Sequence, residues 1–177
     1  ASQELTNLAK YLNFPVTNTL MGLGCYPGDD SHFLQMLGMH GSYEANMAMH
    51  DCDLLIAVGA RFDDRITGRL DKFSPDATVV HIDVDPSSIS KNIKAHIPIV
   101  GDVKGVLEKI ASRIISKKRK PQNIEKWWEQ INEWRKKDSF KYSQDDEINK
   151  PQFVIDRLYE ITKGDAFITS DVGQHQM

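Results

Sequence analysis

Asp53-Leu-Leu-Ile-Ala-Val-Gly59 is the stretch that decides the fold. Its five central residues are apolar, and an aspartate and a glycine enclose them, which is typical of a strand buried inside a sheet. Thr78-Val-Val-His-Ile-Asp-Val84 repeats this pattern, and Ile97-Pro-Ile-Val100 is a shorter version of it. The segments between these runs are long enough for crossover connections. The chain is therefore predicted to be an α/β protein with a doubly wound parallel sheet.

Other segments show the period of a helix or the composition of a strand. Helices are predicted over Glu4–Leu12, Ser42–His50, Val103–Ile115 and Ile124–Lys136, with a further one from Pro151. Strands are predicted over Phe14–Thr19 and Phe167–Val172. The helix over Ile124–Lys136 carries Trp127, Trp128, Ile131 and Trp134 at helical spacing, which predicts a face that docks on a neighbouring domain.

The order of these elements divides the chain into three parts. Residues 1–115 are predicted to form a central nucleotide-binding domain, which opens on a helix and so is expected to lack its first strand. Residues 116–150 are predicted to be a linker that includes the tryptophan-bearing helix. Residues 151–177 are predicted to begin a second α/β domain. We therefore expect the chain to be a piece of a larger enzyme.

Bulk composition narrows the class of protein. The 177 residues are 40% hydrophobic and 27% charged, with a net charge of −3, so no basic field favours nucleic acid as a partner. No apolar run approaches the roughly 20 residues that span a bilayer. Cys25 and Cys52 lack metal-ligand spacing, which predicts buried thiols in a reducing, cytoplasmic compartment. No other cluster of metal-binding side chains or catalytic triad is evident, so no metal site is predicted.

Gly59-Ala-Arg-Phe-Asp-Asp-Arg65 follows the strongest predicted strand directly. Loops at the carboxyl ends of parallel strands face ligands in open α/β sheets. The two arginines and two aspartates are consistent with either of two roles. They form a solvent-exposed salt-bridge cluster, or they clamp an anionic or planar cofactor, with arginine on phosphate or stacked on a ring.

Acidic residues also follow the next two strands. Asp83 and Asp85 close one, and Gly101-Asp102 follows the other. An acidic residue at a strand end often accepts a hydrogen bond from an adenosine ribose hydroxyl, whereas Asp85-Pro86 has the alternative of starting a turn. Three consecutive strands that end in glycine or aspartate favour a nucleotide crevice.

The spacing of the glycines near residues 22–41 argues against an ordinary nicotinamide dehydrogenase. The fingerprint G-x-G-x-x-G is absent, since Gly22-Leu-Gly24 lacks the third glycine. Leu37-Gly-Met-His-Gly41 is predicted to be a loop whose glycines allow close approach to a ligand, with Met39 and His40 placed to touch it. Taken alone, a histidine such as His40 is more often a surface or capping residue than a ligand-binding one.

Together these segments resemble the large catalytic subunit of the acetolactate synthase (acetohydroxyacid synthase) family, of the bacterial biosynthetic type. The matching stretches are Leu37-Gly-Met-His-Gly-Ser-Tyr-Glu-Ala-Asn46, Gly59–Arg65, His81-Ile-Asp-Val-Asp-Pro86, Gly101-Asp102 and Ser170-Asp-Val-Gly-Gln-His-Gln-Met177. The resemblance implies that the chain holds most of a central FAD-binding domain and the entry to a C-terminal domain that binds thiamine diphosphate and Mg²⁺.

The resemblance also implies which residues bind cofactors. Those implied for FAD are Thr19, Leu20, Met21, Leu37, Gly38, Met39, His40, Gly59, Ala60, Arg61, Asp63, Arg65 and Ile66, with Asp83, Val84, Gly101, Asp102 and Val103 around the adenosine half. Those implied near the thiamine diphosphate phosphates and the substrate channel are Val172, Gly173, Gln174, His175, Gln176 and Met177.

Members of the resembled family join two pyruvates, or pyruvate and 2-ketobutyrate, with loss of CO₂ in branched-chain amino acid biosynthesis. The resemblance implies partners as well: the remaining domains of the same enzyme, a homodimer or tetramer, and a small regulatory subunit. It places the activating glutamate and the Mg²⁺ motif outside these 177 residues, so no catalytic residue is assigned and the isolated piece is expected to be inactive. Two alternatives stay open at this point. They are a stand-alone nucleotide-binding or regulatory module, and the central domain of a related thiamine-dependent decarboxylase.

Overall fold

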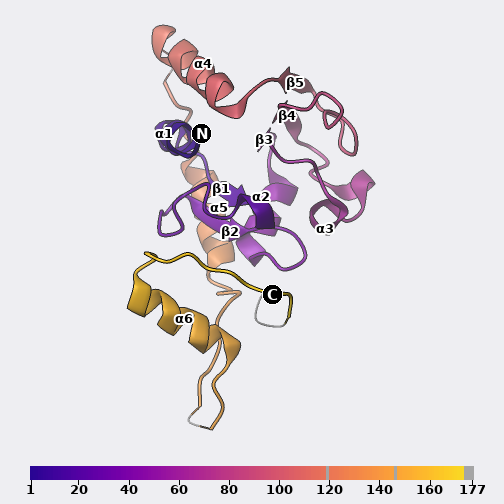
Figure 1. Cartoon of the computed structure of the whole chain (residues 1–177). Coiled ribbons are helices and arrows are strands. Elements are labelled where there is room, and N and C mark those ends of the chain that lie inside the picture. Colours follow the sequence, from indigo (N-terminus) through magenta and orange to yellow (C-terminus); the bar gives the residue numbers. More distant parts are fainter. Residues whose placement is uncertain (119, 146, 174–177) are drawn as a thin grey trace. The chain divides into compact units, whose positions relative to one another are not determined.

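The computed structural model of the protein describes residues 1–118, 120–145 and 147–173. The chain forms two compact units, Ala1–Lys137 and Asp138–Met177. Every described strand belongs to the first unit, while the second contains one described helix (Figure 1). The candidate site therefore has to be built from the first unit.

The strands of the first unit form two parallel sheets. The larger sheet consists of β3 (Leu54–Val58), β4 (Thr78–Asp83) and β5 (Ile97–Val100), with β4 in the centre. The smaller one pairs β1 (Val16–Asn18) with β2 (Phe33–Met36). All three strand pairs are parallel, as their crossover connections require. The predicted α/β class is confirmed, with its parallel strands divided between two sheets.

The helices begin and end close to their predicted positions. They are α1 (Ser2–Leu12), α2 (Tyr43–Asp51), α3 (Asp64–Thr67), α4 (Val103–Ser116), α5 (Glu125–Arg135) and α6 (Pro151–Thr162), with short 3-10 turns η1 (Leu20–Gly22) and η2 (Leu70–Lys72). Sequence reasoning missed β2 and α3. Each has only four residues, too few to establish a period, and Gln35 interrupts β2 with a positive φ of 71°.

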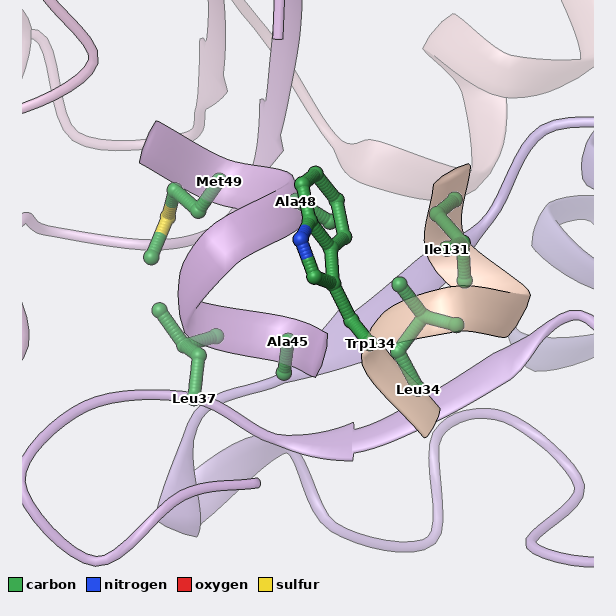
Figure 2. Close-up of a cluster of buried hydrophobic side chains, with 7 residues drawn as sticks. All are labelled: Leu34, Leu37, Ala45, Ala48, Met49, Ile131 and Trp134. Carbon is green, nitrogen blue, oxygen red and sulfur yellow. The ribbon is translucent and has the colours of Figure 1, made fainter. Parts of the chain in front are cut away.

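The main hydrophobic core lies between α2 and α5. Ile131 and Trp134 of α5 pack with Ala45, Ala48 and Met49 of α2, and Leu34 and Leu37 complete the cluster (Figure 2). Trp127 and Trp128 pack at its edge. The tryptophan-bearing face of α5 does pack as predicted, but it packs on α2 within its own unit and not on a neighbouring domain.

The start of α2 is fixed by a buried serine. The Ser42 hydroxyl accepts the N–H of Ala45 at 3.1 Å and donates to the carbonyl of Leu34 at 2.6 Å. One side chain thus caps the helix and ties it to β2. Because Ser42 directly follows Gly41, this cap fixes the position at which the loop Leu37–Gly41 ends and α2 begins.

Two local predictions are wrong. Phe167–Val172 is not a strand: Phe167, Ile168 and Val172 are exposed, and none of the described strands pairs with this segment. An apolar, β-branched composition forms a strand only where a neighbouring strand supplies hydrogen-bond partners. Cys25 is exposed instead of buried, while Cys52 is partly buried with its thiol donating to the carbonyl of Met49.

Within the described residues, no helix has the length and apolar character needed to cross a membrane.

Candidate functional site

The carboxyl ends of β3, β4 and β5 meet at one edge of the larger sheet. The N–H of Gly59 donates to the carbonyl of Ile82 at 2.8 Å, and the N–H of Gly101 donates to the carbonyl of Asp83 at 2.9 Å. These bonds continue the parallel ladders one residue beyond the strands. The sequence-based expectation that the three glycine- or aspartate-bearing strand ends come together is confirmed.

The aspartates at this edge have different surroundings. Asp83 is mostly buried, and its Oδ1 accepts the N–H of Asp85 at 2.8 Å. The carboxylate of Asp85 instead accepts the N–H and the hydroxyl of Ser87, both at 2.8 Å, and these hydrogen bonds lower the pKa of Asp85. Asp85 therefore makes the turn that was its alternative role, and Asp83 is left as the carboxylate at the strand end. Val84 between them is exposed.

The loop after β5 leads into α4. Asp102 is the N-cap of that helix, and its Oδ1 accepts the N–H of Gly105 at 3.1 Å. Val103 follows, and a Cβ atom placed on Gly59 would lie 3.9 Å from a Val103 methyl group. The amino end of α4 thus lies beside the loop after β3, where backbone N–H groups favour negative charge on a ligand.

The loop Gly59–Arg65 is anchored at its centre. Phe62 has a positive φ of 53° and is buried, with its ring edge-on to Phe73 and to His81. The side-chain amide of Asn92 donates to the carbonyl of Phe62 at 2.8 Å. A buried aromatic ring at the centre of the loop leaves the charged side chains on either side directed outwards.

Those charged side chains do form the ion pair that was one of their two predicted roles. Arg61 Nη2 lies 2.8 Å from Asp63 Oδ2, with the arginine largely exposed. Asp63 is also the N-cap of α3 and accepts the N–H of Arg65. An exposed pair of this kind contributes little to stability, so its arginine is free to exchange the carboxylate for a ligand anion.

The glycine loop and the arginine loop are in direct contact. The N–H of Met39 donates to the carbonyl of Arg65 at 3.1 Å. Gly38 has a φ of +96°, and a Cβ atom on it would lie 2.9 Å from the same carbonyl oxygen. Ile66 lies against Gly38 as well. The fold therefore brings the loops Leu37–Gly41 and Gly59–Arg65 into contact, whereas the sequence predicted only that both bind the same cofactor.

An asparagine that was not assigned to the site holds the glycine loop. Asn46 Oδ1 accepts the N–H of Gly38 at 2.8 Å, and Asn46 Nδ2 donates to the carbonyl of Gly38 at 3.0 Å. This paired amide contact fixes the peptide next to Met39. No local pattern marks Asn46, because its role depends on α2 folding back over the loop.

The remaining predicted FAD residues lie in the segments that follow β1 and β2. The Thr19 hydroxyl accepts the N–H of Gly22 at 3.1 Å, and the N–H of Leu37 donates to the carbonyl of Asn18 at 3.2 Å, so the segments after β1 and β2 adjoin. Leu20, Met21, Met39 and His40 are exposed, whereas the side chain of Leu37 is buried in the core. Leu37 could therefore contact a ligand through its backbone but not through its side chain.

The predicted thiamine diphosphate residues belong to the second unit. Val172 is exposed and Gly173 is partly exposed, and Gln174, His175, Gln176 and Met177 lie outside the described residues. Among the described residues, no group of three or more histidine, cysteine, aspartate or glutamate side chains is placed to hold a metal ion.

A parallel α/β unit with glycine-bearing and charged loops at the carboxyl ends of its strands is typical of nucleotide- and cofactor-binding enzyme domains. The chain belongs to the thiamine pyrophosphate enzyme family, because residues 1–110 match the family described as "Thiamine pyrophosphate enzyme, central domain".

Within this family, the chain is similar to acetolactate synthase large subunits. It is 50% identical over 177 residues to the acetolactate synthase large subunit of Haemophilus influenzae, covering 99% of this chain and 31% of that protein. It is 52% identical over 178 residues to the acetolactate synthase isozyme 3 large subunit of Escherichia coli, again covering 99% and 31%. A probable acetolactate synthase large subunit of Methanocaldococcus jannaschii is 44% identical over 183 residues, covering 100% and 31%. The chain thus spans about a third of the length of these relatives.

Proposed function

We propose that this chain is the central part of an acetolactate synthase large subunit, where it binds FAD and leads into the thiamine diphosphate site. Identities of 44–52% to three such subunits, over nearly the whole chain, support the parent activity. The parent enzyme joins two pyruvates, or pyruvate and 2-ketobutyrate, with loss of CO₂. Thiamine diphosphate supplies the electron sink for that reaction.

The observation that carries the FAD assignment is the single edge where the loops after β3, β4 and β5 meet. Asp83 offers a carboxylate acceptor for a ribose hydroxyl, and the start of α4 offers backbone N–H groups beside Gly59. Arg61 and Arg65 are exposed and can approach phosphate oxygens. These donors and acceptors suit a dinucleotide bound in an extended form.

Exposed apolar side chains support the flavin half of the assignment. Met21, in the turn η1 after β1, is 92% exposed, and Met39, in the loop after β2, is 64% exposed. Methionine packs well on aromatic rings, because its thioether is polarisable and its chain adapts its shape. A planar ring system would remove both side chains from water.

The wider assembly belongs to the same proposal. The central domain is assigned to residues 1–115, the linker to 116–150 and the start of the thiamine diphosphate domain to 151–177. The remaining domains of the enzyme supply the other half of the thiamine site and the Mg²⁺ ligands. The parent forms a homodimer or tetramer, with a small regulatory subunit as a further partner.

Cofactor retention by the full-length parent protein tests the FAD assignment. The purified protein is stripped of cofactors, incubated with FAD or with ADP, and passed through a desalting column. Retained flavin absorbance after incubation with FAD is the expected result. Retention of ADP with no flavin would favour the central domain of a related thiamine-dependent decarboxylase instead.

Acetolactate formation from pyruvate tests the parent activity. The full-length protein with FAD, thiamine diphosphate and Mg²⁺ should form acetolactate, and a polypeptide of these 177 residues alone should form none. Robust acetolactate formation by the 177-residue polypeptide would contradict the proposal that catalysis needs the remaining domains.

A further inference from the structure

His81 is the buried polar group that the fold leaves unexplained. The residue lies on β4 and has 0% exposure. Among the described residues, neither of its ring nitrogens has a hydrogen-bond partner. Burial of a polar group without a partner costs free energy, and an apolar side chain in the same place would avoid that cost. A function for the imidazole is therefore needed to account for its presence.

The surroundings of the ring point to the nucleotide edge. His81 Nε2 lies 4.0 Å from Asp83 Oδ2, about one ångström beyond a charge-assisted hydrogen bond. The other oxygen of Asp83 already accepts the N–H of Asp85. On its other side, the His81 ring meets the Phe62 ring edge-on, with 5.0 Å between ring centroids. His81 therefore touches the loop after β3 and approaches the carboxylate at the end of β4.

We propose that His81 is a positioning residue for nucleotide binding. When a ribose hydroxyl of FAD donates to Asp83, a small rotation lets His81 Nε2–H donate to Asp83 Oδ2 and hold the carboxylate in place. The imidazole N–H then gains the partner that it otherwise lacks. This inference rests on the proposed function, because it assigns the ribose of the dinucleotide to Asp83.

The test uses the stripped full-length parent protein and two readouts, FAD affinity by titration and the melting temperature without FAD. His81→Leu removes the unpaired nitrogens, so the melting temperature should stay the same or rise. FAD affinity should fall by roughly 10- to 100-fold, as expected for loss of a hydrogen bond to a charged group. His81→Gln restores an N–H donor at similar reach and should recover most of the affinity. Val79→Ala, on the same face of β4, is the matched control and should lower only the melting temperature.

Each other outcome overturns a specific statement. If Asp83→Asn weakens FAD binding and His81→Leu does not, the positioning role is wrong and the nucleotide edge stands. If neither substitution changes FAD affinity, the assignment of ribose to Asp83 fails as well. If His81→Leu lowers the melting temperature and His81→Gln does not recover affinity, His81 is a packing residue.

Discussion

Substitution of Gly38 by alanine tests whether the glycine loop and the arginine loop work as one unit. Gly38 has a φ of +96°, where an L-residue with a Cβ atom is strained by about 1–2 kcal/mol. The new Cβ would also lie 2.9 Å from the Arg65 carbonyl oxygen, which is backbone and cannot simply rotate away. Moving the loops apart would break the Met39–Arg65 hydrogen bond, a further loss of about 0.5–1.5 kcal/mol. The total expected destabilisation is about 1.5–3.5 kcal/mol.

Gly24 provides a matched control. Its φ of +87° is close to that of Gly38, but no atom lies within 4 Å of the position that a Cβ would occupy. Gly24→Ala should therefore cost only the backbone strain, about 1–2 kcal/mol. The difference between the two variants isolates the contact between the loops.

The assay compares both variants in the full-length parent protein. Without FAD, the melting temperature of the Gly38→Ala variant should fall below that of the Gly24→Ala variant. FAD affinity should fall by about tenfold in Gly38→Ala, the equivalent of about 1.4 kcal/mol, and stay unchanged in Gly24→Ala. Equal effects of the two substitutions on both quantities would refute the coupling of the loops through Gly38.

Three further substitutions or measurements test the physical basis of the fold. Ser42→Ala should lower the free energy of unfolding by about 2–3 kcal/mol in chemical denaturation, because it removes a helix cap and leaves the buried Leu34 carbonyl unpaired. A loss smaller than the roughly 1 kcal/mol of an exposed helix cap would contradict this prediction. Hydrogen bonds, first from Lys10, lower the pKa of the Asp30 carboxyl. Its contribution to stability is therefore fully present above the unfolded pKa of about 4 and is lost as the pH falls through the lower folded-state pKa. Asp30→Asn should cost about 1 kcal/mol at pH 7, and in an acid titration of stability the difference from the unsubstituted protein should begin to narrow below about pH 4 and close only well below it. Burial raises the pKa of Cys52 to about 11. Maleimide at pH 8 should therefore label the exposed Cys25 rapidly and Cys52 slowly. Equal labelling rates of the two thiols would contradict the raised pKa of Cys52.

Much of the fold follows from local sequence patterns. The apolar run at Leu54–Val58 and the aspartate that ends Thr78–Asp83 were sufficient to predict parallel strands with polar residues at one edge. Spacing of apolar residues identified α4 and α5 to within one residue at each end. These predictions succeed because periodicity and capping act over a few residues, which a single sequence displays directly.

Local patterns fail where a segment depends on a distant partner. Phe167–Val172 has the composition of a strand but no described strand beside it, and its apolar side chains are exposed. Asn46 and His81 lie within segments that were singled out, yet nothing in the spacing marks either one. Their contacts, with Gly38 and with Phe62, join residues on different elements.

The sequence by itself determined the parallel α/β class, the likeness to acetolactate synthase subunits and the glycine-bearing and charged loops that follow the strands. Only the tertiary structure decided that the Met39 N–H bonds the Arg65 carbonyl, and that Trp134 packs on α2. It alone showed that the ring nitrogens of His81 are buried without a partner and that the Phe62 ring lies against the imidazole. The physical reason is that secondary structure obeys short-range dihedral and hydrogen-bond rules, whereas these contacts depend on chain crossovers that bring distant residues together.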